Sequence, residues 1–140
     1  MDFDEQPIST ELTFIIRAEV EPPRPAGPTP DGARVLIPIT GGRFEGPAIA
    51  GSVLPGADRL VVRSDGVRFV DALYELETDD GAIINVHNSG PANPDGVTRT
   101  SPRFIAPVGP HDWLNKSIFV GTLDAHVEDG YVLIRVDRII

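Results

Sequence analysis

The sequence predicts a single all-β domain, and three features carry that prediction. Its 140 residues include 14 glycines and 14 prolines, one residue in five, which favours many turns and few helices. Three Asp-Gly turns separate apolar, partly alternating runs, a strong signal for β-hairpins because the turn positions need positive φ. Between Ile39 and Gly56, five glycines interrupt strand-like sequence, and such glycines mark the bulges and corners that bend a sheet.

The expected strands follow one another with few interruptions. Thr10–Val20 is rich in β-branched and aromatic residues and forms the first strand. Residues 21–32 contain five prolines and are expected to be a stiff surface connection, since proline suits neither a helix nor a central strand. Residues 89–101 hold two glycines and two prolines among few apolar residues, which predicts a loop of about 13 residues. The other strands are expected at residues 35–39, 48–54, 57–63, 67–78, 82–88, 117–127 and 131–139.

About nine strands in so short a domain must stack or close, because an open sheet would leave two exposed edges. The glycine-rich bend favours closure. The expected fold is therefore one antiparallel β-barrel of about eight to ten strands, of the calycin or lipocalin type, with little or no helix. Residues 1–9 are expected to be an N-terminal tail and residues 10–140 the barrel domain. A barrel of this size has room inside for packed side chains or one small ligand.

The charge balance excludes some partners. The chain has 21 acidic and 12 basic residues, a formal net charge of −9 and an isoelectric point near 4.6. Nucleic acid and anionic membrane surfaces would be repelled, so neither is an expected partner. The acidic start lacks the pattern of a signal peptide, no apolar run is long enough to span a membrane, and cysteine is absent. A cytoplasmic location is expected.

Seven short motifs follow one another along the chain. They are Ile37-Pro38-Ile39-Thr40-Gly41-Gly42, Phe44-Glu45-Gly46-Pro47, Leu54-Pro55-Gly56-Ala57-Asp58, Asp79-Asp80-Gly81-Ala82, Asn88-Ser89-Gly90, Pro102-Arg103-Phe104 and the nine residues from Trp113 to Gly121. Together they resemble the DUF3237 family, also called UPF0311, from about Thr13 to Ile139. The resemblance implies a compact antiparallel barrel with a cavity and no generally established activity. It also implies a homodimer or higher homo-oligomer.

Asp71 is the first candidate for a catalytic residue. Strand alternation places it on one face with Phe69 and Leu73, and Tyr74 on the other face. A carboxyl between apolar neighbours, facing a cavity, has a raised pKa suited to acid/base work. The alternative is a structural carboxylate paired with an arginine or capping a bulge. Phe69 and Tyr74 are both expected to bind substrate.

The segment around Trp113 offers a second candidate surface. Read as a strand, it places Trp113, Asn115, Ser117 and Phe119 on one face. An aromatic ring beside an amide and a hydroxyl is typical of a ligand cavity, in which apolar walls give affinity and polar groups give orientation. The alternative is that Trp113 belongs to the core and Asn115 fixes a turn.

Other polar residues are candidates with strong structural alternatives. Arg63 and Arg103 present a donor fork suited to a carboxylate, enolate or phenolate, and the alternative for each is a solvated or purely structural role. Asp58 follows Pro-Gly and either binds substrate or fixes a turn. His111 is a candidate for proton transfer, or a surface histidine in a loop. The histidines at positions 87, 111 and 126 lack the close spacing of helical zinc motifs, so no metal site is expected.

Two classes of function follow from these candidates. The first is a cofactor-independent isomerase, cyclase, hydratase or lyase that acts on an aromatic or polyketide-like molecule. In it Asp71 is the base, Arg103 and Asn115 stabilise oxyanion charge, and Trp113 and Phe69 form an aromatic wall. The second is a small-molecule carrier in which the same groups only orient the ligand. No motif for a cofactor is present in the sequence, and none is expected.

Overall fold

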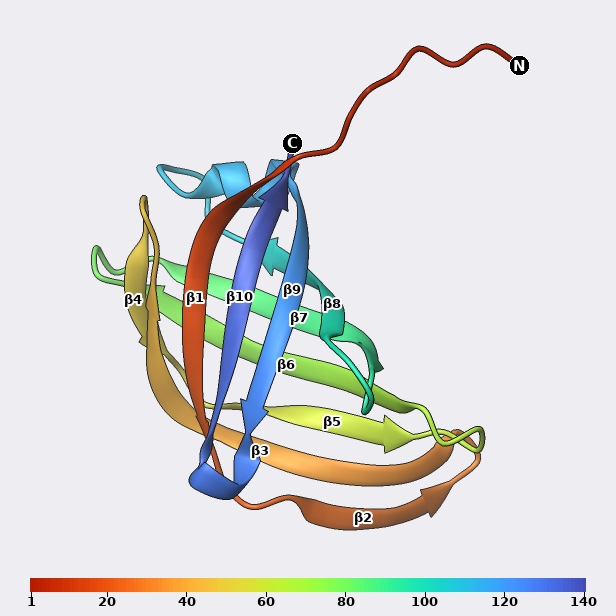
Figure 1. The fold of residues 1–140 in the computed structure, drawn as a ribbon. Coiled ribbons are helices and arrows are strands. Elements are labelled where there is room, and N and C mark those ends of the chain that lie inside the picture. The colour runs from red at the N-terminus through yellow and green to blue at the C-terminus, as the bar shows by residue number, and fades with distance from the viewer.

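Ten antiparallel strands and two short 3-10 helices make up the computed structural model, which describes all 140 residues (Figure 1). The strands are β1 (Thr10–Val20), β2 (Arg24–Thr29), β3 (Gly32–Glu45), β4 (Ala50–Val53), β5 (Gly56–Val62), β6 (Arg68–Thr78), β7 (Ile83–Ala92), β8 (Thr98–Ile105), β9 (Ile118–His126) and β10 (Tyr131–Ile139). The helices are η1 (Asp112–Lys116) and η2 (Val127–Asp129). The predicted all-β class is confirmed. Neither helix has the length or hydropathy to cross a membrane.

The sheet closes on itself because β1 pairs with two strands. One edge of β1 pairs with β10 and the other with the second half of β3. From β10 the order continues through β9, β8 and β7 to β6. Strands β4 and β5 both bridge β6 to β3, at successive positions, and so act as two pieces of one wall strand. The result is a closed antiparallel barrel of eight wall strands, as the sequence predicts.

Glycines allow the bends and close contacts that closure needs. Gly42 has φ of +132°, and a Cβ there would lie 1.9 Å from the carbonyl oxygen of Arg17 on β1. Gly56 begins β5 at a point where a Cβ would lie 2.3 Å from the carbonyl oxygen of Leu73 and 2.5 Å from Cβ of Tyr74. Any side chain at these positions would push neighbouring strands apart. The prediction that the glycine-rich stretch bends the sheet is confirmed.

The three predicted hairpins are also confirmed. Gly66 joins β5 to β6, Gly81 joins β6 to β7, and Gly130 joins β9 to β10 through η2. Their φ values are +84°, +91° and +83°, in the left-handed region that glycine adopts without strain.

Three predictions of local structure are wrong. The proline-rich segment contains β2, which pairs only with β3 and so is an edge strand, the one setting in a sheet that tolerates proline. Strand β7 continues to Ala92, so the predicted 13-residue loop shrinks to residues 93–97. Residues 112–116 form η1 and not a strand, so alternation does not describe the faces of Trp113 and Asn115.

The two halves of the barrel interior differ. One half is filled by an aromatic cluster, defined as Phe14, Phe44, Phe104 and Phe119, which packs with other buried apolar residues such as Leu76. Phe14 contacts Phe44 and Phe104 edge to face, with ring centroids 5.3 and 5.4 Å apart, and Phe104 contacts Phe119 at 5.0 Å. Such contacts add to the stabilisation from burial. The other half is hollow.

Candidate functional site

The hollow half of the barrel contains a cavity of about 480 Å³. This volume lies within the range of small-molecule sites. Fourteen of the 21 lining residues are hydrophobic, and they come from strands on every side of the barrel. The rim is formed by the loop between β7 and β8, including Asn93 and Pro94, and by the end of β9 at Asp124. An apolar or partly apolar ligand fits such a surface.

Two polar side chains lie on the same part of the cavity wall, separated by one strand. Asp58 on β5 pairs in register with Ala72 on β6, and Ala72 pairs with Asn88 on β7. All three residues line the cavity. Neighbouring strands lie about 4.8 Å apart, so the backbones of Asp58 and Asn88 are separated by about 10 Å. The small Ala72 between them leaves space in which a ligand can contact both.

Asp58 is held in place by the next strand. Its Oδ1 accepts a hydrogen bond of 3.0 Å from the backbone N–H of Asp71. Protein atoms surround the carboxyl, and burial raises its pKa above the ordinary value, although the hydrogen bond from Asp71 opposes that change. The side chain remains partly accessible from the cavity. It is therefore a carboxyl with perturbed acidity that a ligand can reach.

Tyr74 lies on β6, two residues beyond Ala72 and on the same inner face. Only 4% of the residue is exposed, and its hydroxyl has no hydrogen-bond partner in the protein. Burial raises the pKa of this hydroxyl, and the nearby charge of Asp58 raises it further. Tyr74 is thus a neutral hydroxyl that keeps its proton and can donate it in a hydrogen bond.

Asn88 completes the set. It is 3% exposed, and its side-chain carbonyl oxygen also has no partner. Buried polar groups are almost always hydrogen-bonded, because leaving one unpaired costs about 1–3 kcal/mol. Two such groups on the wall of one apolar cavity indicate a place where a ligand supplies the missing partners. We define Asp58, Tyr74 and Asn88 as the polar triad.

The prediction that Asp71 faces the cavity is wrong. Residues 70, 72, 74 and 76 are the buried face of β6, so Asp71, Phe69 and Leu73 lie on the outer face. Asp71 contacts the imidazole Nε2 of His87 at 2.6 Å on that outer face. Arg103 is opposite His87 in the β7–β8 pairing and is exposed. Alternation groups residues by face, but it does not say which face is inward.

Trp113 and Asn115 are also outside the cavity. The side chain of Asn115 accepts a hydrogen bond of 2.7 Å from the backbone N–H of Ala106 and donates one of 2.9 Å to its carbonyl oxygen. It thereby fastens η1 to the chain just after β8, which is the turn-fixing alternative. Trp113 packs against the outside of the core, with the Arg138 guanidinium 5.9 Å from its ring centroid.

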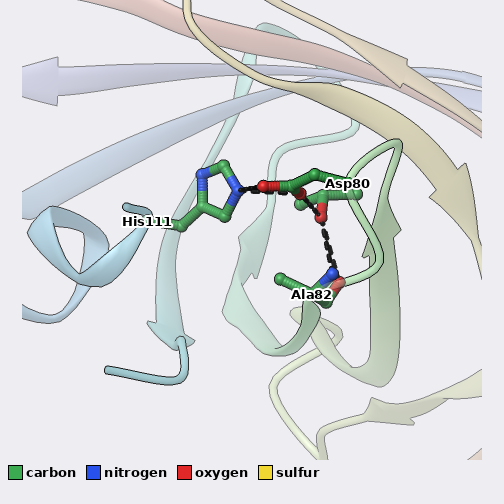
Figure 2. Close-up of polar contacts among 4 residues, drawn as sticks. Asp80, Ala82 and His111 are labelled. Atoms are coloured by element: carbon green, nitrogen blue, oxygen red, sulfur yellow. Dashed lines mark hydrogen bonds and ion pairs between the residues drawn. The ribbon is translucent and has the colours of Figure 1, made fainter. Parts of the chain in front are cut away.

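His111 and Arg63 make polar contacts away from the cavity. Figure 2 shows the His111 ring against the carboxylate of Asp80, with Nε2 2.9 and 3.0 Å from the two oxygens. Asp80 also accepts a hydrogen bond from the Thr78 hydroxyl. This bond, and to a lesser degree the contact with His111, lowers the pKa of the Asp80 carboxyl. Arg63 forms an ion pair with Asp65 in the β5–β6 turn. Neither His111 nor Arg63 lines the cavity.

Of the predicted site residues, the structure brings Asp58 and Tyr74 together at the cavity, and the sequence reasoning missed Asn88 as a site residue. The signal was present in β7, where Ile84, Val86 and Asn88 alternate with polar residues. An amide that continues an inward apolar series is a candidate cavity group. No group of three or more His, Asp or Glu side chains is arranged to hold a metal ion.

Comparison with known proteins identifies the family of this chain. The family model described as "Protein of unknown function (DUF3237)" matches residues 8–97. The UPF0311 protein RPA1785 of Rhodopseudomonas palustris is 34% identical over 139 residues, which cover 86% of this chain and 91% of the relative. Its crystal structure superposes with a TM-score of 0.87 at 32% identity, covering 97% of this chain and all of the other.

Two further solved structures are similar. A β-barrel-like protein of Acinetobacter baumannii has a TM-score of 0.88 and 28% identity, covering 99% of this chain and all of the other. A protein of Penicillium herquei described as an enzyme has a TM-score of 0.82 and 25% identity over the full length of both chains. The matched model and the relatives confirm the family that the sequence resembles, and the chain belongs to the DUF3237 (UPF0311) family.

Proposed function

We propose that the protein is a small-molecule enzyme that moves a proton on an aromatic or polyketide-like substrate held in the barrel cavity. The observation that carries the proposal is the polar triad, in which a carboxyl of raised pKa adjoins two buried polar groups without protein partners. The similar Penicillium herquei protein, described as an enzyme, supports a catalytic role for this kind of barrel. The reaction class is isomerisation, cyclisation, hydration or elimination.

Each member of the triad has a distinct part in this proposal. Asp58, once ionised, is a stronger base than a surface carboxylate because burial raises its pKa, and it takes a proton from a carbon or hydroxyl beside a carbonyl group. Tyr74 keeps its own proton and donates a hydrogen bond to the carbonyl oxygen, where negative charge develops. Asn88 orients the substrate. Asp58 then returns the proton to another position of the substrate or to a leaving group.

The remaining lining favours a largely apolar substrate. The walls are formed by aliphatic residues such as Val70, Leu60 and Ile134, so affinity comes from burial of apolar surface. This same observation favours a second function, that of a carrier in which the triad only orients a ligand. The two functions differ in whether a bound compound is changed.

A ligand screen separates these functions. Aromatic and polyketide-like compounds are screened by thermal shift, since binding to the native state raises Tm. Each hit is then incubated with the protein and followed by liquid chromatography and mass spectrometry. Conversion of a hit supports the enzyme, and recovery of every hit unchanged supports the carrier. A screen without hits contradicts both.

Matched variants then test the triad. Asp58→Asn keeps the shape and the hydrogen-bond acceptor but removes the base, so turnover is expected to fall by at least about 100-fold while binding persists. Asp71→Asn makes the same change on the outer face and is expected to retain turnover. If Asp71→Asn abolishes turnover and Asp58→Asn does not, the sequence-based choice of Asp71 is right and the role of Asp58 is wrong.

A further inference from the structure

The barrel wall has one incompletely paired seam, between β8 and β9. Strand β8 pairs with β7 over residues 101–105, but it pairs with β9 only over residues 98–100. Strand β9 pairs with β10 along its whole length. Residues 101–105 of β8 and 118–120 of β9 therefore have a strand neighbour on one side only. Pro102 accounts for the break, since proline cannot donate to a ladder.

This seam is a hollow with an apolar floor. A depression of about 700 Å³ lies along it, and Arg103 is the only charged residue among the ten that line it. The floor contains Phe104, Leu114 and Phe119, which belong to the buried core. The rim carries Ile105 and Ile118, which are 56% and 72% exposed. Unpaired strand edges beside exposed apolar side chains favour the addition of another strand.

The N-terminal tail has the chemistry that fits this seam. Phe3 and Ile8 are 79% and 77% exposed. Asp2, Asp4 and Glu5 flank Phe3 and give this short segment three negative charges. The seam carries the opposite charge. Arg103 is one of its lining residues, and the exposed Lys116 lies in sequence between the lining residues Asn115 and Ser117.

The tail is directed away from its own barrel. It continues the line of β1 beyond the barrel end (Figure 1). Two backbone hydrogen bonds of 2.9 Å between Ser9 and Ile140 fix its base. Pro7 then keeps Gln6 in an extended conformation, which disfavours an immediate reversal toward the same molecule.

We propose that the N-terminal tail of a second copy of this chain docks in the seam. Residues 2–6 add a short strand along the edges of β8 and β9, with Phe3 over the apolar floor. Their carboxylates face Arg103 and Lys116. Because both copies carry a tail and a seam, the exchange is reciprocal and gives a two-fold symmetric dimer. This inference is independent of the chemistry proposed for the cavity.

The test measures dimerisation of the full chain by sedimentation velocity over a dilution series. Phe3→Ser and Ile118→Lys are each expected to raise the dimer Kd by at least about tenfold, since buried aromatic and aliphatic anchors dominate interfaces. Val97→Ser is the control, because Val97 is similarly exposed but lies in the β7–β8 loop. A monomeric wild type, or a dimer Kd unchanged in Phe3→Ser, would overturn the proposal.

Cysteine cross-linking distinguishes a second copy from the same chain. The protein has no cysteine, so introduced thiols have no competitors. Phe3→Cys and Ile118→Cys are made in separate chains, mixed and oxidised, and a disulfide between the two chains is expected. The doubly substituted chain is examined in parallel at high dilution. A disulfide that forms only within that chain, and not in the mixture, would show that the tail docks on its own barrel and would overturn the exchange.

Discussion

The backbone N–H of Asp71 donates a hydrogen bond of 3.0 Å to the carboxylate of Asp58, and the two acids point to opposite faces of the barrel wall. Asp71 on the outer face meets His87 and solvent. Asp58 on the inner face meets the cavity. One hydrogen bond thus joins the backbone of a residue that contacts His87 on the surface to the candidate catalytic carboxyl.

The raised pKa of Asp58 predicts a specific dependence of stability on pH. Its ordinary pKa is 3.8, and burial raises it in the folded protein. At pH values between the ordinary pKa and the raised pKa of Asp58, the folded state therefore binds more protons than the unfolded state. The free energy of unfolding consequently falls as pH rises through this window. Asp58→Asn removes that contribution because an amide does not titrate. Urea unfolding of both proteins from about pH 4 to about pH 8 measures the difference.

The expected result is a free energy of unfolding that declines less with rising pH in Asp58→Asn than in the wild type. At neutral pH the variant is expected to be as stable as the wild type or more stable. Asp71→Asn, which removes a carboxylate from the outer face, controls for the change in net charge. Equal pH slopes for wild type and Asp58→Asn would contradict the prediction.

Tyr74→Phe is expected to stabilise the ligand-free protein. The Tyr74 hydroxyl is buried without a partner, and an unpaired buried polar group costs about 1–3 kcal/mol. Its removal is expected to raise the free energy of unfolding by about 1 kcal/mol, and to weaken binding of any ligand found in the screen. Chemical unfolding and ligand titration measure the two effects. A destabilised variant would show that the hydroxyl has a partner in the ligand-free protein.

Ala72→Leu is expected to block the site while preserving the fold. The larger side chain fills the space between Asp58 and Asn88, so thermal shifts by ligands are expected to disappear. Each added buried methylene contributes about 0.8 kcal/mol, so Tm without ligand is expected to stay the same or rise. Ala33→Leu, an exposed position on β3, is the control. Ligand shifts that survive in Ala72→Leu would place the binding site elsewhere.

Asn115→Ala is expected to lower stability without changing catalysis. Its amide satisfies both the N–H and the carbonyl oxygen of Ala106, a buried residue. Loss of these partners is expected to cost about 1–3 kcal/mol of unfolding free energy. Turnover per folded molecule is expected to be unchanged, because Asn115 does not line the cavity. A fall in turnover at full folding would restore the catalytic role predicted from the sequence.

The fold was more predictable than the site. The Asp-Gly hairpins were predictable because they depend on local backbone conformation. Gly66 and Gly81 adopt the positive φ that these turns require. The bends near Gly42 and Gly56 were predictable because glycine in strand sequence indicates close backbone contact. The edge strand β2 was missed because proline lowers strand propensity but does not prevent pairing on one side.

The site depends on relations between strands that a single sequence does not state. Alternation grouped Asp71 with Leu73 and Tyr74 with Ala72, but closure of the barrel decides which group is inside. Asn88 joins Asp58 only through the registers of two hairpins. Trp113 was misplaced because five residues of 3-10 helix have no clear periodic signature.

Because one half of the barrel is solid and the other hollow, the four phenylalanines of the aromatic cluster are distinct from the residues that a guest molecule meets. The aromatic cluster anchors the strands at one end, whereas positions such as Val70 and Leu123 border empty space. A substitution at such a position changes the shape of the chamber and leaves the four phenylalanines in place. A barrel of this kind is suited to diversification, since one inherited scaffold can serve many different small molecules.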